Sequence, residues 1–200
     1  SGEISSTQTE QTGLFTEELQ NLTDTIQWIE YTFTSRIVNV SEDKPYCNNG
    51  ETRTFRVWIN PIPHLEAIID DTIYCDTSTV IFNINNINGT VFGTKLYDVR
   101  VEYTPGAVTS TFGPVETNNT FPGYISDDLV NNTDSLQLIR YIFTPKIYNP
   151  GGKDPSKYCI NSGTIDTITV YLNPTPRLTA VLSTDTVLCD TSYHELSLFT

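Results

Sequence analysis

Basic residues are scarce in this sequence. Its 200 residues include 11 Lys and Arg against 24 Asp and Glu, which gives a formal net charge of −13 at pH 7. A field of that sign repels the phosphate backbone of nucleic acids and anionic lipid headgroups. Nucleic acid is therefore excluded as an expected partner.

Long hydrophobic runs are missing as well. There is no stretch of about 18 apolar residues that could span a bilayer. The sequence also lacks the charged start and short apolar segment that together mark a signal peptide. The sequence has no Met and 4 Cys, a composition that suits a chain outside the cell. We expect a chain that does not span a membrane, and since it starts and stops within a repeating pattern, we expect a fragment of a longer protein.

What the sequence does contain is a long internal repeat. Residues 13–34, GLFTEELQNLTDTIQWIEYTFT, align without gaps on residues 123–144, GYISDDLVNNTDSLQLIRYIFT, with 10 of 22 positions identical. The offset is 110 there, 112 between Cys47 and Cys159, and 114 between Cys75 and Cys189. A period of this length is too long for a solenoid unit and matches a complete small β domain.

Apolar residues recur with a period of two within each copy. In TFRVWIN, Phe55, Val57 and Ile59 share one face, and TITVYLN places Ile168, Val170 and Leu172 in the same way. This alternation predicts half-buried antiparallel strands. YDVRVEY follows the same rule, with Tyr97, Val99, Val101 and Tyr103 predicted inward. The one hint of helix is a single turn capped by Ser126 or Thr16 in SDDL or TEEL. The expected fold class is all-β, with tandem Ig-like antiparallel sandwiches arranged as beads on a string.

The segments NPIP and NPTP mark the ends of the repeats. Proline cannot donate a hydrogen bond to a ladder, so these segments should end strand pairing and join one domain to the next. Residues 1–63 are then the later part of one sandwich, residues 64–176 are a complete one, and residues 177–200 begin a third.

An ordered set of motifs resembles a known family. A G-x-x-[ST]-[DE]-[DE]-L-x-N-x-T-D segment is followed by Y-x-F-T, a loop Cys, a strand ending in NPxP, and CDTS. This set resembles the PKD-like repeats of Bacteroidota cell-surface adhesins, and within them a giant gliding-motility adhesin. The resemblance implies export by the type IX secretion system and display at the outer membrane of a Gram-negative bacterium. A Gly expected soon after the cysteine is absent from CDTS, which is a departure from the family pattern.

The four cysteines allow three pairings. The repeat register favours Cys47 with Cys75 and Cys159 with Cys189, each bridge tying the end of one domain to the first strands of the next. Such a bridge would stabilise the fold by about 3 to 4 kcal/mol. A zinc site needs closely spaced pairs such as C-x-x-C, which the sequence does not contain. Free thiols are the remaining alternative.

Residues that could carry chemistry do not form an enzyme motif. His64 and His194 do not recur between the copies, and no nucleophile elbow, zinc-protease motif or phosphate loop accompanies them. We therefore expect no enzyme, no cofactor and no metal site. The acidic pairs Glu17/Glu18, Asp70/Asp71 and Asp127/Asp128 could hold structural calcium, but we favour solvated charge.

A short motif, Asp followed by Ser or Thr and an aliphatic residue, occurs five times. It resembles the O-glycosylation signal of exported Bacteroidota proteins, and the resemblance implies sugars on Thr25, Thr72, Ser135, Thr167 and Thr186. The alternation puts Thr167 on the outer face of its strand. N-x-[ST] sequences also occur, but they arise often by accident in an Asn-rich, Thr-rich chain.

The function predicted from these observations is mechanical. The chain is expected to be a repeat segment of a long, filamentous cell-surface adhesin that gives reach and stability in gliding motility or surface adhesion. Its expected partners are neighbouring repeats of the same chain, an external surface or polysaccharide, and the outer-membrane gliding and secretion machinery. The alternative is a carbohydrate- or protein-binding sandwich of a secreted or receptor protein, which an exposed cluster of Trp28, Trp58 and Tyr171 would favour. We expect Trp58 and Tyr171 to pack at the joint instead.

Overall fold

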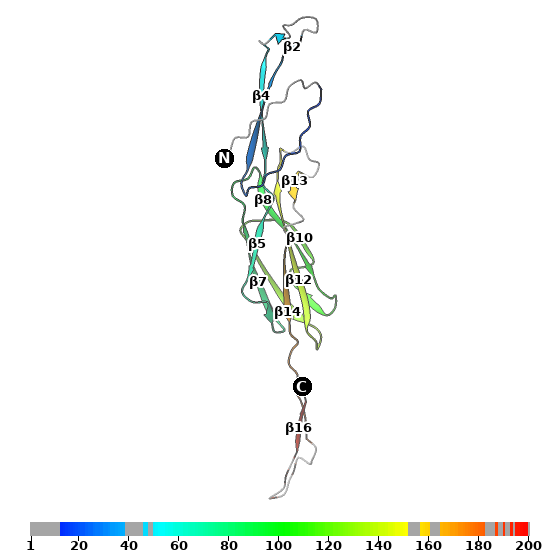
Figure 1. Cartoon of the computed structure of the whole chain (residues 1–200). Helices are drawn as coiled ribbons and strands as arrows, with labels where there is room; N and C mark the ends of the chain where they lie inside the picture. The colour runs from blue at the N-terminus through cyan, green and yellow to red at the C-terminus, as the bar shows by residue number, and fades with distance from the viewer. Residues whose placement is uncertain are drawn as a thin grey trace. The chain divides into compact units, whose positions relative to one another are not determined.

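The structure is a computed structural model of the whole chain and describes residues 13–38, 46–47, 50–151, 157–160, 165–182, 187, 190, 193 and 195–199. Among these residues every regular element is a β-strand (Figure 1), and no helix is long and apolar enough to cross a membrane. The chain divides into two compact units. Unit 1 consists of Ser1–Ile62 with Asn88–Phe92, and unit 2 consists of Pro63–Ile87 with Gly93–Thr200. We describe each unit by itself.

Unit 1 is built on a pair of long antiparallel strands, β1 (Gln27–Thr34) and β4 (Thr52–Ile59). Trp28 lies opposite Trp58, and every second residue along each strand points to the same face. A short antiparallel pair, β2 (Ile37–Val38) and β3 (Tyr46–Cys47), extends the connection between them. The residues that strand alternation assigns to an apolar face, Phe55 and Val57 among them, therefore do share one face of this pair.

Unit 2 contains two sheets. One has the order β5 (Leu65–Ile69), β7 (Ser78–Asn86), β11 (Gly123–Asn131) and β9 (Val108–Ser110). The other has the order β10 (Val115–Thr120), β8 (Thr94–Glu102), β12 (Gln137–Tyr148), β14 (Asp166–Leu172) and β6 (Ile73–Tyr74), with β13 (Tyr158–Ile160) beside β12. In Figure 1, β5 lies with β7, and β12 lies with β14.

The strand order of unit 2 is that of an immunoglobulin sandwich. One sheet has the order β5-β7-β11-β9, which corresponds to strands A, B, E and D of the immunoglobulin sandwich, and β8, β12 and β14 of the other sheet correspond to strands C, F and G. β10, which lies between β9 and β11 in the chain, adds an edge strand beside β8. The first strand breaks at residues 70–72 and continues as β6, which pairs in parallel with the end of β14. The predicted fold class, all-β with an Ig-like antiparallel sandwich, is confirmed.

The core of unit 2 lies between these sheets. Phe82 on β7 meets Tyr141 and Phe143 on β12, with ring centroids 4.4 and 5.5 Å apart. Val99 and Val170 are fully buried beside them. Burying each such side chain contributes about 1.5 to 3 kcal/mol, so the facing sheets hold each other together.

Strand alternation predicts the buried faces of unit 2 correctly, whereas Phe55 and Val57 of unit 1 share a face but are 57% and 40% exposed. Tyr97, Val99 and Val101 point into the core of unit 2, and Asp98 and Glu102 lie on the other face of the same strand. The predicted helical turn at SDDL is wrong, because Ser126 and both aspartates lie inside β11. The run of alternating apolar residues on either side outweighs the capping signal.

The boundary between the units falls between Ile62 and Pro63, inside the NPIP segment. Beyond NPTP, β15 (Thr179–Leu182) pairs with β16 (Leu196–Phe199) as an antiparallel hairpin. The assignment of residues 177–200 to a third repeat, like the predicted boundaries after residues 63 and 176, stays a prediction.

Candidate binding surface and polar clusters

The exposed face of unit 1 carries a pair of tryptophans. Trp28 and Trp58 lie opposite each other on β1 and β4, with ring centroids 6.4 Å apart. They are 48% and 51% exposed. The guanidinium carbon of Arg56 lies 4.3 Å from the Trp28 ring centroid, and its nitrogens donate to Glu30 at 3.0 and 3.1 Å. These four side chains form what we call the Trp patch.

The chemistry of the Trp patch suits a ligand with both apolar and polar faces. Large rings with a polar edge are common at binding surfaces because they give contact area at low entropic cost. The Arg56–Glu30 pair beside them supplies a donor and an acceptor. The expectation that Trp58 and Tyr171 are packed away is not met, because both side chains are exposed.

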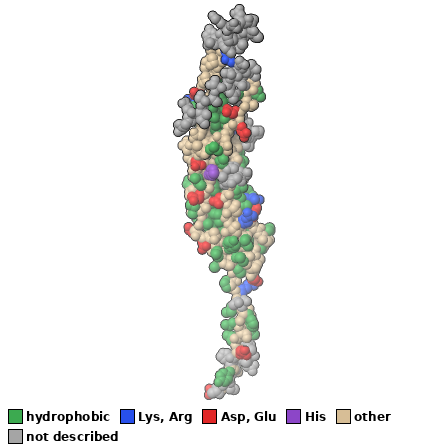
Figure 2. All heavy atoms as spheres, viewed as in Figure 1, with side chains coloured by type: hydrophobic (Ala, Val, Ile, Leu, Met, Phe, Trp, Pro, Cys, Tyr) green, Lys and Arg blue, Asp and Glu red, His purple; other side chains and the backbone are tan. Residues whose placement is uncertain are grey.

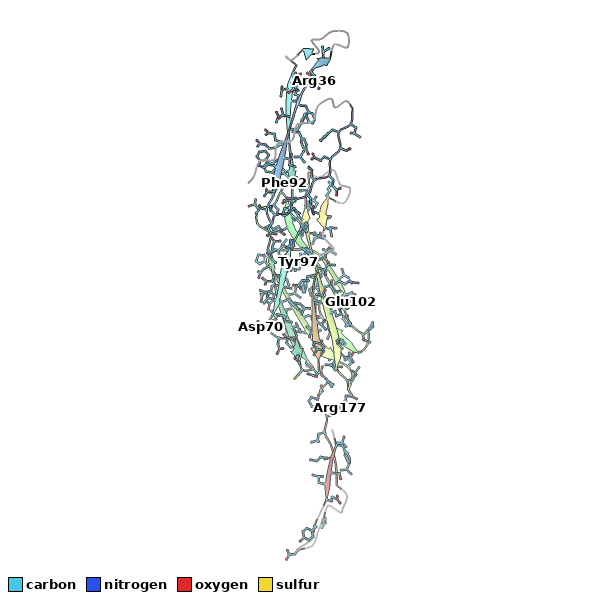
Figure 3. The ribbon with its side chains drawn as sticks, in the orientation of Figure 1. Arg36, Asp70, Phe92, Tyr97, Glu102 and Arg177 are labelled. Atoms are coloured by element: carbon cyan, nitrogen blue, oxygen red, sulfur yellow. The ribbon has the colours of Figure 1, made fainter. Side chains whose placement is uncertain are left out.

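Unit 2 has a plainer version of the same surface. Leu138 on β12 lies opposite Tyr171 on β14, at the positions that match Trp28 and Trp58. Arg140, the next outward residue of β12, pairs with Glu102 at 3.1 Å; Figure 3 labels Glu102. One ring therefore replaces two, so the stacking surface is smaller in unit 2.

A buried asparagine organises the turn before β12. The side-chain amide of Asn131 donates to the carbonyls of Ser135 and Leu172 at 2.9 and 3.0 Å. Its Oδ1 accepts from the backbone N–H and the hydroxyl of Thr133 at 2.9 and 2.8 Å. The turn is an Asx turn, and Asn131 fastens it to the last residue of β14.

Unit 1 builds the same network from its own copy of the motif. Asn21 donates to the carbonyls of Thr25 and Ile59 at 2.8 and 2.9 Å. Its Oδ1 accepts from Thr23 at 2.9 and 2.8 Å. The N-x-T-D motif is therefore a structural fastener that occurs once per repeat, and the burial of both asparagines leaves no room for a glycan on them.

A fully buried carboxylate lies between the sheets of unit 2. Asp127 accepts hydrogen bonds from Tyr141 Oη at 2.6 Å, from the Ser110 hydroxyl at 2.8 and 2.9 Å, and from the backbone N–H groups of Thr111 and Phe112 at 2.9 and 3.1 Å. Donors surround the charge, which is the condition for burying it. Burial, and then the hydrogen bond to Asp127, raise the pKa of Tyr141 well above its usual range.

The same pairing recurs in unit 1 at the matching positions. Tyr31 Oη donates to Glu17 at 2.5 Å, and that hydrogen bond raises the pKa of Tyr31. This contact is exposed, whereas the Asp127 contact is buried. Sequence reasoning placed both acids in solvent and missed the buried one. The signal was present, because Asp127 shares the inward period of Ile125 and Leu129.

The aspartate of CDTS also has a defined role. Asp76 accepts from the backbone N–H of Asn131 at 2.6 Å and from the hydroxyl of Thr175 in NPTP. These hydrogen bonds, with that of Thr175 the largest cause, lower the pKa of Asp76. The motif therefore anchors the NPTP segment to the sandwich of unit 2.

In each acidic pair at least one carboxylate accepts a hydrogen bond from a protein donor. Asp128 accepts from the Thr79 hydroxyl at 2.6 Å, and Asp71 accepts from the backbone N–H groups of Thr72 and Ile73 at 2.6 and 3.0 Å. Within the described part of the chain, no group of three or more metal-ligating side chains comes together. The view of Asp127 as solvated charge is corrected, because its donors place it in the core.

Of the four cysteines, the two whose side chains the structure describes are not bridged. Cys75 and Cys159 carry free thiols, and the side chains of Cys47 and Cys189 lie outside the described residues. Cys75 follows the end of β6 beside Leu172, while Cys159 on β13 lies opposite Ile147. Ten residues of β12 separate the two places in the register, a distance of about 30 Å. The pairing of Cys47 with Cys75 and of Cys159 with Cys189 stays a prediction that the structure does not support.

Four of the five predicted O-glycosylation residues are exposed. Thr25, Thr72, Ser135 and Thr167 all reach solvent, and Thr186 lies outside the described residues. Exposure is the physical requirement for modification, and glycosylation at the five positions stays a prediction. Of the histidines, His64 is half-buried at the start of unit 2, and His194 is outside the described residues.

Together, the strand order and the duplicated fasteners define a class: a β-sandwich protein of Ig-like topology whose structural motifs repeat along the chain. No family model matches the sequence, and no curated protein matches it.

Two solved structures show a distant likeness. WR4, a C. elegans MSP family member, aligns at 11% identity and a TM-score of 0.32 over 54% of this chain and 96% of its own. The Yersinia pseudotuberculosis adhesin InvE aligns at 10% identity and a TM-score of 0.33 over 74% of this chain, which spans 49% of the adhesin. At these scores the fold rests on the strand pairing described above.

Proposed function

We propose that the chain is a repeat segment of a long cell-surface adhesin, to which it gives reach and mechanical stability. The observation that carries this proposal is the duplicated fastener, in which Asn21 and Asn131 each tie a turn to the end of the last strand of a repeat. Pulling on a chain through a strand end loads these hydrogen bonds first. A fastener repeated at that place suits a protein that works under tension.

The setting we propose for it is the outer membrane of a Gram-negative bacterium. The resemblance to PKD-like repeats, closest to the gliding-motility adhesin SprB, supports export by the type IX system and a role in gliding or attachment. Partners would be neighbouring repeats, the outer-membrane machinery and an external surface or polysaccharide. The net charge of −13 supports electrostatic repulsion between neighbouring filaments, which disfavours their association. Figure 2 shows few basic side chains on the visible face.

Single-molecule pulling of the whole chain tests the mechanical role. The sandwich strands of unit 2 span residues 65–172, so their unfolding in one step should lengthen the tether by at most about 38 nm, given about 3.5 Å for each of these 108 residues. Asn131→Ala should lower the unfolding force, while Asn83→Ala, at an exposed position of β7, should leave it unchanged. Smooth extension of the native chain without a force peak would contradict the proposal. Antibody labelling of intact cells of the source organism tests the location separately.

The second candidate is carbohydrate binding, and the Trp patch favours it. Two half-exposed rings, one with a cation above its face, offer the stacking surface that a sugar ring needs. A glycan array probed with the chain and with Trp28→Ala/Trp58→Ala tests it. Thr32→Ala/Thr54→Ala, a cross-strand pair further along the same face, is the matched control. Signals that survive loss of both rings would rule out the patch.

That the chain is not an enzyme and uses no cofactor remains part of this proposal. Structural calcium likewise remains open to a direct test by calorimetric titration of the chain.

A further inference from the structure

Residues 88–92 belong to the second repeat by sequence but to unit 1 by packing. They connect β7 to β8, and the sequence Asn88-Gly89-Thr90 forms their bend. Unit 1 holds this segment with five hydrogen bonds, so it acts as a receptor for the loop. These hydrogen bonds identify the groups of unit 1 that form the receptor.

Two of the bonds run to the turn that Asn21 fastens. The Ile26 N–H donates to the Thr90 carbonyl at 2.8 Å, and the Gly89 N–H donates to the Asp24 carbonyl at 2.8 Å. The approach is close: a Cβ at Gly89 would lie 2.5 Å from Thr25 Cγ2. A side chain at position 89 would therefore have to displace Thr25 where the loop crosses the turn.

The other bonds come from the NPIP segment. The Asn60 side chain accepts from the Phe92 N–H at 2.7 Å and donates to the Phe92 carbonyl at 2.8 Å, so it grips one residue at both backbone groups. Asn88 donates to the Ile62 carbonyl at 2.8 Å. Phe92 is labelled in Figure 3. An amide that reads both groups of a backbone residue recognises chain position and not side-chain identity.

Unit 2 presents the same receptor groups. In the repeat, Asp24 corresponds to Asp134, Ile26 to Leu136 and Asn60 to Asn173. The Asx turn and its fastener are the same in both copies. Leu136 and Asn173 are exposed. Among the described residues, no hydrogen bond reaches the Leu136 N–H, the Asp134 carbonyl or the Asn173 side chain.

We propose that each repeat ends in a loop receptor, and that the receptor of unit 2 binds the Asn-Gly loop between the second and third strands of the repeat that follows. We infer this binding partner from unit 1, whose corresponding groups hold residues 88–92, the loop of the repeat that follows it. The Asn of NPxP is the positioning residue. The inference rests on the proposed tandem function and adds how consecutive repeats are fixed to each other.

Amide hydrogen exchange in the 200-residue chain tests the filled receptor. Asn60→Ala should speed exchange of the Phe92 and Ile26 amides by about tenfold or more, and the matched Asn173→Ala should leave both unchanged. Gly89→Ala should have the same effect from the loop side, since its Cβ meets Thr25. Native exchange at Phe92 in both Asn60→Ala and Gly89→Ala would overturn the receptor.

A chain with a following repeat tests the open receptor. Residues 177–200 are replaced by a second copy of residues 64–176, which contain all the strands from β5 to β14. The Leu136 amide should then exchange about tenfold more slowly than in the 200-residue chain, and Asn173→Ala should reverse this. Unchanged Leu136 exchange, with the added copy folded by its own protected β7 amides, would overturn the proposal. Because adhesion is not measured, that result would count against the receptor and not against the proposed function.

Discussion

The same face of the same strand has a different fate in the two units. Phe143 on β12 is fully buried, whereas Phe33, its counterpart on β1, is 44% exposed. The sequence around them is nearly the same, and both strands alternate in the same way. What differs is the facing layer. Phe143 meets Phe82 of the opposite sheet. Phe33 meets Tyr31 and Phe55 of its own sheet, and Phe15 of the segment before β1, which forms no strand. The comparison shows that a period of two determines which side chains share a face of the sheet. A second sheet packed on that face determines how deeply they are buried and how much they stabilise the fold.

The largest test of this difference is truncation of the matched phenylalanines. Phe143→Ala should destabilise unit 2 by about 3 to 5 kcal/mol, because it removes a ring from a close-packed core. Phe33→Ala should cost unit 1 about 1 kcal/mol or less, since half of that ring is already in water. Chemical denaturation separates the units, as both tryptophans lie in unit 1 and report on it by fluorescence. Equal losses would show that unit 1 buries Phe33 in solution.

The buried carboxylate gives the next largest effect. Asp127→Asn keeps the shape but turns an NH₂ toward Ser110 or Tyr141, both of which donate to the native carboxylate. We expect a loss of about 2 to 3 kcal/mol in unit 2. Glu17→Gln, at the matching exposed contact, should change stability by less than about 0.5 kcal/mol. Circular dichroism during urea unfolding measures both, and a neutral Asp127→Asn would show that the charge is not needed there.

Substitution of the two fastener asparagines, Asn131 and Asn21, should destabilise the two units equally, unlike the two preceding pairs of substitutions. Asn131→Ala and Asn21→Ala each leave two backbone carbonyls without their side-chain donor. Each should cost about 1 to 2 kcal/mol, and the two losses should agree within about 0.5 kcal/mol. A much larger loss in one unit would mean that the two networks are not equivalent, despite their matching distances.

The smallest effect concerns acid. Because the pKa of Asp76 is lowered in the folded chain, its contribution is complete above the ordinary aspartate value of about 3.9. The contribution is lost as the pH falls through the lower native pKa. Asp76→Asn should therefore be less stable than the native chain at pH 7, with the gap closing toward pH 3. Melting temperatures of the two chains across this pH range measure the gap. A gap that stays constant with pH would show that the charge of the Asp76 carboxylate does not cause the difference in stability.

Much of the fold could be predicted from the sequence because the relevant physics is local. Alternation in TITVYLN predicted Val170 and Leu172 on one face, and both are buried in the core of unit 2. The Asx turns of the repeated N-x-T-D motif were not predicted. The hint of a helical turn at SDDL is wrong, because the alternation of Ile125, Asp127 and Leu129 continues through the capping candidate Ser126. The buried role of Asp127 was missed for the same reason: an acidic pair suggests solvent unless its register is followed residue by residue.

The sequence by itself determined where the strands of unit 2 alternate and which of their residues face inward, since alternation depends on neighbours a few residues apart. The tertiary structure alone decided three further points. It brought Ser110, Thr111 and Tyr141 around Asp127, it put Cys75 and Cys159 near opposite ends of one sheet, and it gave residues 88–92 to unit 1. Each of these joins residues from separate strands or loops, and only the packing of two sheets or a long connection can set which distant groups meet.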